Sequence, residues 1–274
     1  VIQDGGQQNS NTSEAFASSS LMLDMGDMGT VGFDQGVGEF GVSTIDDKMP
    51  YAYEEIWTYT GASNGLAAAG GCNVIGYKNT FAGVSLSLEI DPGHSTSLTD
   101  TSGCNGDGVS SGAGETVSGY NYAITAAVPY VEGLSVGVGH GKEENNNQIA
   151  TQALRTDVTF TTGYATYAVG PVTIGMQKSS KNGGTAGATS NNIDIFGVSF
   201  NVNDNFAISY SNMDNETDKT GGGTDVTEET TGIGASYTMG SASIRLLNAE
   251  TDNVGGDTAK ASVEHTELSL LLAF

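Results

Sequence analysis

The sequence predicts an all-β fold, a single antiparallel transmembrane β-barrel formed by residues 1–274. Three observations support this prediction. Apolar residues recur with a period of two, short and long links between the strands alternate strictly, and the second face of the strands carries mainly Ser, Thr, Gly and Ala. A soluble sandwich would expose that second face to water, where Lys and Glu are the usual residues.

Composition and charge exclude several other classes of protein. The chain has 274 residues, with 40 Gly and 4 Pro, and its 32 Asp+Glu against 9 Lys+Arg give a net charge of -23. This charge argues against nucleic acid or an anionic membrane surface as a partner, because both need clustered Lys and Arg. No apolar run approaches the roughly 20 residues of a membrane-spanning helix.

The strands are recognised one after another by their alternation. The first strand covers 14–25. The clearest alternation is in 84–90, where Val84, Leu86, Leu88 and Ile90 point to one face while the Ser and Glu residues between them point to the other. The same pattern returns at 134–138, 206–211, 232–239 and 267–274. Strands of roughly 9–12 residues are long enough to cross the hydrocarbon when tilted.

The links between strands are of two kinds. The short links are 26–27, 79–83, 129–133, 170–171, 203–205 and 240–241, and the long links are 35–70, 92–115, 143–153, 180–191, 216–227 and 251–261. Six short and six long links separate thirteen strands. A barrel in an outer membrane has short turns on one side and long loops on the other, which explains the alternation.

Two parts of the chain resemble known sequences. The run 267–274, with alternate apolar residues and a final Phe274, resembles the C-terminal strand of Gram-negative outer-membrane barrels. This resemblance implies an assembly signal at Leu270, Leu272 and Phe274. The link 35–70 lies where a general diffusion porin carries its third loop, and Gly38-Glu-Phe-Gly41 is similar to the core of that loop. The overall composition resembles porins of alphaproteobacteria.

The resemblance implies a barrel of 16 strands, whereas the links separate only thirteen. If 35–70 is the third loop, the strand at 14–25 is the fourth strand of the barrel. We therefore expect three further strands, on the order of 60 residues, before Val1. Thirteen strands alone would leave two unpaired edges in lipid, which is costly.

The same resemblance implies that 35–70 folds into the lumen and forms the constriction of a water-filled pore. The candidate constriction residues are Asp34 at its edge, Glu39, Asp46, Asp47, Glu54 and Glu55 within it, and the single cation Lys48. Carboxylates on one side of a narrow pore attract cations and repel anions. For each acid, simple solvation of a loop residue is the alternative.

Cationic side chains on the facing wall complete a transverse field in the porin family. Lys78, Arg155 and Arg245 fall on the small, polar phase of their strands and are the candidate wall residues. The loop also carries Trp57 and three tyrosines, for which we expect packing against the barrel wall. A stacking surface for sugars is the alternative.

The remaining candidates concern cysteines and metals. Cys72 and Cys104 are expected on the outer side of the membrane, where a disulfide between two loops is feasible in an oxidising compartment; two free thiols are the alternative. The three histidines lie far apart without metal-binding spacing. The acidic stretch 214–225 offers oxygen ligands for Ca²⁺, although it lacks the EF-hand pattern.

Taken together, the sequence predicts a porin of the Gram-negative outer membrane that lets small hydrophilic solutes and ions diffuse passively. It predicts a cation preference, a homotrimer in contact with outer-membrane lipid, and neither an enzymatic activity nor a cofactor. The adjacent Glu54 and Glu55 do not define two carboxylates that flank a glycosidic bond. The alternatives are a secreted or surface-attached all-β adhesin and a channel with a specific sugar or peptide site.

Overall fold

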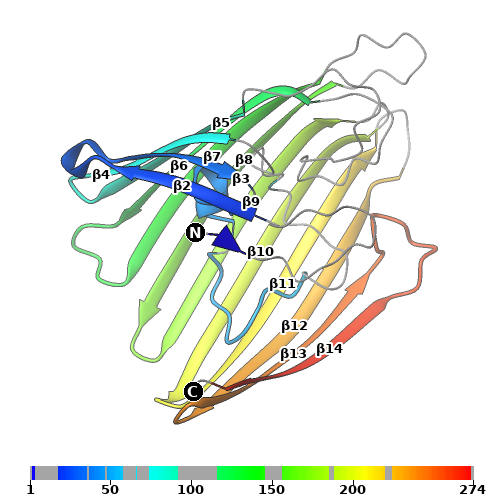
Figure 1. Ribbon diagram of the computed structural model, residues 1–274. Coiled ribbons are helices and arrows are strands. Elements are labelled where there is room, and N and C mark those ends of the chain that lie inside the picture. The colour runs from blue at the N-terminus through cyan, green and yellow to red at the C-terminus, as the bar shows by residue number, and fades with distance from the viewer. Residues whose placement is uncertain are drawn as a thin grey trace.

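The computed structural model describes residues 2–3, 18–35, 37–46, 48–57, 66, 74–91, 116–145, 156–184, 188–219 and 224–272. The strands among them form one curved antiparallel sheet (Figure 1). Its strands are β1 Ile2–Gln3, β2 Ser18–Asp24, β3 Thr30–Gln35, β4 Val74–Phe81, β5 Val84–Asp91, β6 Thr116–Ala127, β7 Leu134–Asn145, β8 Thr156–Val169, β9 Val172–Gly184, β10 Ala188–Asn203, β11 Phe206–Lys219, β12 Val226–Met239, β13 Ala242–Asp252 and β14 Val263–Leu272. Two 3-10 turns accompany them, η1 Gly26–Met28 and η2 Gly41–Thr44. In this part of the chain, no helix is long and apolar enough to cross a membrane.

The thirteen predicted strands are confirmed as β2–β14, and each pairs with its neighbour in the sequence. The sequence missed β1, which pairs Ile2 with Ser19 and is too short to show a period. The first predicted strand was placed at 14–25, whereas β2 covers Ser18–Asp24 and residues 4–17 lie outside the described ones. Among the described strands β14 pairs only with β13, so the described sheet is open. The expectation of three preceding strands stays a prediction.

All six short links are confirmed as connections between neighbouring strands at one end of the sheet. Four of them contain two residues, at 82–83, 170–171, 204–205 and 240–241. In the first, Ala82 and Gly83 have φ values of 49° and 84°. Positive φ at both positions is typical of the hairpin turn that matches the twist of its strands.

Two of the predicted long links are wrong in extent, because the strands continue through most of them. Only 185–187 separate β9 from β10, and only 220–225 separate β11 from β12. Polar side chains bridge these strand ends: the Asn191 side-chain amide donates to Asn215 Oδ1 at 3.0 Å and to Thr217 Oγ1 at 2.9 Å. The part of a strand that extends into water carries the same polar residues as a loop. Composition alone therefore did not distinguish these strand ends from loops. The expected length of roughly 9–12 residues is accordingly exceeded by β10, which has 16.

The two faces of the sheet are inverted relative to a soluble protein. On β5, Leu88 and Ile90 are 37% and 58% exposed, whereas Ser87 and Glu89 are 7% and 2% exposed. We call the face of Ser87 and Glu89 the inner face and the opposite one the outer face. Large apolar side chains are exposed along the outer face from β2 to β14. An apolar surface of this extent is unfavourable in water and suits hydrocarbon.

The outer face changes character along the strands. On β11, Phe206, Ile208 and Tyr210 follow the short link, and Asp214 and Glu216 follow further along the same face. The apolar band therefore covers the half of each long strand nearest the short links, and the polar half extends past the hydrocarbon. This explains why strands longer than the membrane requires remain stable.

The core of the protein lies between the inner face and the segment 37–57, which we call loop 37–57 (residue 47 is not among those described). Val42, Ile45 and Ile56 of the loop are fully or nearly fully buried, and they belong to one apolar cluster with Phe160 and Ile195 of the sheet. Figure 1 shows the loop crossing one side of the curved sheet. The expected folding of this segment onto the inner face agrees with these contacts.

Glycines on the inner face create the space that the loop occupies. A Cβ atom at Gly76 would lie 2.0 Å from the Phe40 ring, and one at Gly175 would lie 2.5 Å from the Pro50 ring. Such contacts are too short for any side chain. At these two positions glycine therefore makes room for side chains of the loop.

Candidate functional site

Loop 37–57 begins at a buried carboxylate. Asp34, on β3, is 1% exposed, and its two oxygens accept hydrogen bonds from the backbone N–H groups of Val37 at 2.8 Å and Glu39 at 2.6 Å. Charge-assisted bonds of this kind are the stronger ones and determine the direction in which the loop leaves the strand. The sequence predicted Asp34 at the edge of the constriction, and the structure places it at the base of the loop.

The turn η2 is held by side chains of two neighbouring strands. The Gly41 N–H donates to Ser87 Oγ at 2.8 Å, and the Val42 N–H donates to Asn121 Oδ1 at 2.8 Å. The Asn121 side-chain amide in turn donates to Glu89 Oε1 at 3.0 Å. Gly41 has φ 60°, and a Cβ atom there would lie 1.7 Å from Asn121 Oδ1, so only glycine fits.

One predicted wall residue contacts the loop through an ion pair. Lys78 Nζ lies 2.8 Å from Glu39 Oε2 and 5.3 Å from the centre of the Phe40 ring. Both charged side chains are partly exposed, so the pair contributes on the order of 1 kcal/mol or less. Its main consequence is geometric, because it places Glu39 and Lys78 next to each other on the inner face.

The second predicted wall residue contacts the far part of the loop. The Arg245 guanidinium lies 5.6 Å from the centre of the Tyr53 ring, and the Tyr53 hydroxyl donates to Glu267 Oε1 at 2.5 Å. This hydrogen bond raises the pKa of Tyr53, because loss of the proton would place a phenolate beside a carboxylate. The loop therefore reaches from β4 at one end to β13 and β14 at the other.

The remaining predicted constriction and wall residues differ in how far they are buried. Asp46, Glu54 and Glu55 are half-buried along the loop, and Lys48 is exposed. Asp47 and Arg155 lie outside the described residues. Of the predicted loop acids and wall cations, Glu39 and Lys78 form an ion pair, whereas Arg245 faces the Tyr53 ring.

Sequence reasoning missed a group of buried acids on the inner face. Glu89, Asp91 and Glu143 are 2%, 6% and 8% exposed. Asp91 and Glu143 both lie opposite Gly119, which separates them in one row across β5, β6 and β7. The alternation in 84–90 had already placed Glu89 on the polar phase, and this phase is the signal that could have identified it as a wall residue.

The aromatic side chains of the loop are packed, as expected. Trp57 is 7% exposed and belongs to the apolar cluster, and its ring meets that of Tyr51 edge-on at 5.9 Å. A Trp ring covered in this way presents no open stacking face for a sugar. The described aromatic residues of the loop therefore favour packing over the alternative role.

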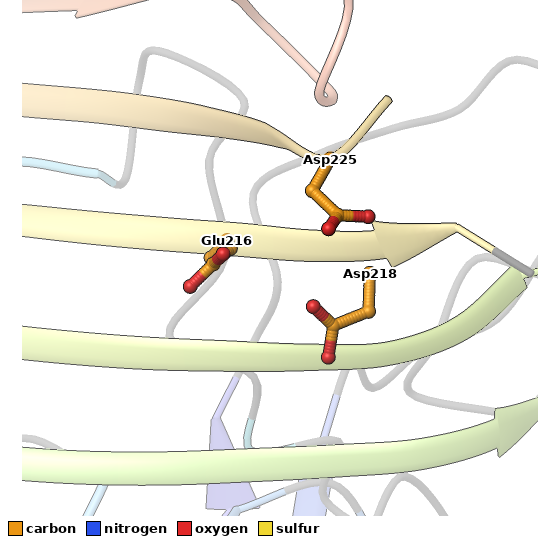
Figure 2. A group of neighbouring side chains, drawn as sticks. All are labelled: Glu216, Asp218 and Asp225. Carbon is orange, nitrogen blue, oxygen red and sulfur yellow. The ribbon is translucent and has the colours of Figure 1, made fainter. Parts of the chain in front are cut away.

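Three carboxylates meet at the long-link ends of β11 and β12. The carboxylate oxygens of Glu216, Asp218 and Asp225 lie within 4.8 Å of one another (Figure 2). Within the described part of the chain, this is the single group of His, Cys, Asp and Glu side chains with the geometry to hold a metal ion. Oxygen ligands suit Ca²⁺, and the group falls within the stretch 214–225 predicted for it.

The remaining predictions concern the assembly signal at the C-terminal strand and the two cysteines. Leu270 and Leu272 lie on β14 and are 63% and 51% exposed, which is consistent with an outer face in lipid. Phe274, Cys72 and Cys104 lie outside the described residues. The proposed assembly signal and the disulfide stay predictions.

A curved antiparallel sheet with an apolar outer face and a loop packed on its polar inner face defines a β-barrel of the outer-membrane type. The sequence matches the family model of the Gram-negative porin over residues 3–259, and the chain belongs to this family. It is therefore an outer-membrane channel protein, and the family consists of diffusion channels rather than enzymes. No curated protein matches the chain.

Solved structures show the same fold at low sequence identity. OmpF of Salmonella typhi, in complex with daunomycin, has a TM-score of 0.64 at 11% identity, with 98% of this chain and 81% of that one covered. Outer-membrane expressed OmpT of Vibrio cholerae has a TM-score of 0.59 at 15% identity, covering 93% and 78%. A porin refined at 1.8 Å has a TM-score of 0.56 at 17% identity, covering 93% and 80%.

Proposed function

We propose that this porin is a passive channel for small hydrophilic solutes, that loop 37–57 forms its constriction, and that it prefers cations. The observation that supports the proposal is the position of the loop. It is attached to β4 through Glu39 and Lys78 and to β14 through Tyr53 and Glu267, so it crosses the inner face. A loop held at both sides narrows a pore permanently.

The charges near the loop support the cation preference. Asp46, Glu54 and Glu55 lie on the loop, and each is half-buried rather than fully covered. Two of the predicted wall cations, Lys78 and Arg245, are engaged by Glu39 and Tyr53. Fixed carboxylates attract cations more strongly where the water column is thin.

The reversal potential in a KCl gradient across a planar bilayer tests this proposal. We expect potassium to be more permeant than chloride, and we expect the double variant Glu54→Gln/Glu55→Gln to lower the permeability ratio roughly twofold or more. The matched control Glu229→Gln/Glu250→Gln removes the same charge from exposed positions of β12 and β13 and leaves the ratio unchanged. A chloride preference of the unmodified channel would contradict the proposal.

We also propose that the protein assembles as a homotrimer within outer-membrane lipid. One of the similar solved structures, at 13% identity and a TM-score of 0.57, is described as the trimer form of Vibrio cholerae OmpT. The adhesin alternative has no support from the family or the fold. The aromatic residues of the loop do not favour a specific sugar site there, because Trp57 is buried.

A further inference from the structure

A second feature of the inner face lies between loop 37–57 and the short links. Here a cavity of about 600 Å³ is bounded by Thr44 and Lys48 of the loop and by inner-face side chains of β3–β8. Its size falls within the range of small-molecule pockets. It lies beside the part of the loop that carries Lys48, on the side of the membrane where the strands turn tightly.

Hydroxyl groups dominate the lining of this cavity. Five threonines, three serines and one tyrosine contribute to it, among them Thr125, Ser135 and Thr166. Ser87, Thr44, Thr80 and Ser85 are engaged in hydrogen bonds within the protein. Thr125, Ser135 and Thr166 have no side-chain hydrogen bond to the described residues, so their hydroxyls can donate to and accept from a ligand that itself carries several hydroxyls. Among the described residues that line the cavity, none carries a carboxylate, although the chain has 32 acidic residues.

The charges of the cavity are positive. Lys48 and Lys78 both line it, and together they are two of the nine Lys+Arg in the chain. Lys78 is paired with Glu39 at 2.8 Å and is thereby held in place. Lys48 is exposed, and within the described residues it has no ion-pair partner. Its ammonium group is available to a negatively charged ligand.

We propose that this cavity is a binding site for small polyhydroxylated carboxylates, the sugar acids, along their path through the channel. The carboxylate of the ligand faces Lys48, and its hydroxyls exchange hydrogen bonds with the Ser and Thr side chains. This inference rests on the proposed function in one respect, namely that loop 37–57 lies in an open lumen. In a protein of net charge -23, such a site offsets the repulsion that an anionic solute meets elsewhere.

Binding is measured without conductance, by saturation-transfer NMR titration of gluconate into the detergent-solubilised protein. We expect saturable binding of gluconate and at least tenfold weaker binding of both sorbitol, which lacks the charge, and acetate, which lacks the hydroxyls. The variant Lys48→Gln lowers the gluconate affinity at least tenfold, because it removes a charge-assisted hydrogen bond. Thr166→Val, which removes one hydroxyl and keeps the shape, lowers it about threefold.

The matched control is Lys260→Gln, which removes the same charge from an exposed position in the link between β13 and β14. It leaves the gluconate affinity unchanged. Equal affinities in the Lys48→Gln and Lys260→Gln variants, or no saturable binding to the unmodified protein, would overturn the inference. The KCl reversal potential is measured separately. If gluconate does not bind but the current is cation-selective, the sugar-acid site is refuted and the proposed channel function is not.

Discussion

Gly76 shows how a single residue on the inner face decides where the loop lies. The Phe40 ring occupies the space that a Cβ atom at Gly76 would need. Gly163 lies on the opposite face, and a Cβ atom there would meet its nearest atoms at 3.8 Å, an ordinary contact. The same amino acid therefore serves close packing at one position and has no steric role at the other.

This difference predicts opposite outcomes for two identical substitutions. We expect Gly76→Ala to displace Phe40 and to lower the free energy of unfolding by about 1–3 kcal/mol. Gly163→Ala, the control, changes it by less than about 0.5 kcal/mol. Urea unfolding of the refolded protein in detergent measures both. Equal stabilities would mean that Phe40 is not seated against Gly76.

At the scale of elements, loop 37–57 depends on side chains of the strands beneath it. Asn121 accepts from the Val42 N–H and donates to Glu89, so one amide connects the loop, β6 and β5. It is 2% exposed, and water does not replace it easily. These hydrogen bonds fix η2 to the wall.

We expect Asn121→Ala to loosen the loop, because it leaves a buried N–H and a buried carboxylate without this partner. Each such group costs about 1–3 kcal/mol. Single-channel recordings should show increased current noise, and urea unfolding should show reduced stability. Asn212→Ala, on the outer face of β11, is the control and leaves both unchanged. Quiet channels in the Asn121 variant would contradict the anchoring role.

The acidic group lies where β11 ends and β12 begins, with Glu216 and Asp218 on β11 and Asp225 directly before β12. Ser190 Oγ donates to Asp218 Oδ2 at 2.6 Å, which orients that carboxylate. Three carboxylates so close to one another repel, and a bound cation relieves the repulsion. Ca²⁺ binding here stays a prediction.

If Ca²⁺ binds this group, millimolar CaCl₂ raises the Tm by about 2–4 °C and EGTA reverses the rise. The variant Asp225→Asn loses the response to Ca²⁺. Asp204→Asn, in a short link at the opposite end of the sheet, keeps it. Identical responses of the two variants would place any Ca²⁺ effect elsewhere in the molecule.

At the scale of the whole molecule, the apolar outer face and polar inner face determine the environment in which the protein is stable. On the outer face, Leu21, Leu268 and Met239 are 75%, 73% and 67% exposed. Such side chains need hydrocarbon or another apolar surface around them. The apolar band covers the half of the strands nearest the short links, so the polar half and the long links face one side of the membrane. The fold therefore has one orientation relative to the lipid.

The proposed homotrimer makes a prediction at this scale. Without boiling, we expect the protein to migrate in SDS as an oligomer of about three times the mass of the chain, because paired β-strands and buried interfaces resist SDS. Boiling converts it to the monomer. Migration as a monomer before boiling, in a preparation that conducts in bilayers, would refute the trimer and leave the channel function intact.

The sequence by itself determined thirteen of the fourteen described strands, the order of the short links and the identity of the two faces. These follow from a period of two and from turn residues, which are local features that neighbouring residues specify among themselves. It failed at 180–191 and 216–227, because polar residues that pair across strands in water have the composition of loops.

Only the tertiary structure decided where the loop residues lie. Asp34 holds the base of the loop, Glu39 meets Lys78, and Tyr53 joins Arg245 to Glu267. The Val42 and Asn121 partners are 79 positions apart, and the Tyr53 and Glu267 partners are 214 apart. No period or spacing in the chain encodes such pairs, because the curvature of the sheet around the loop brings them together.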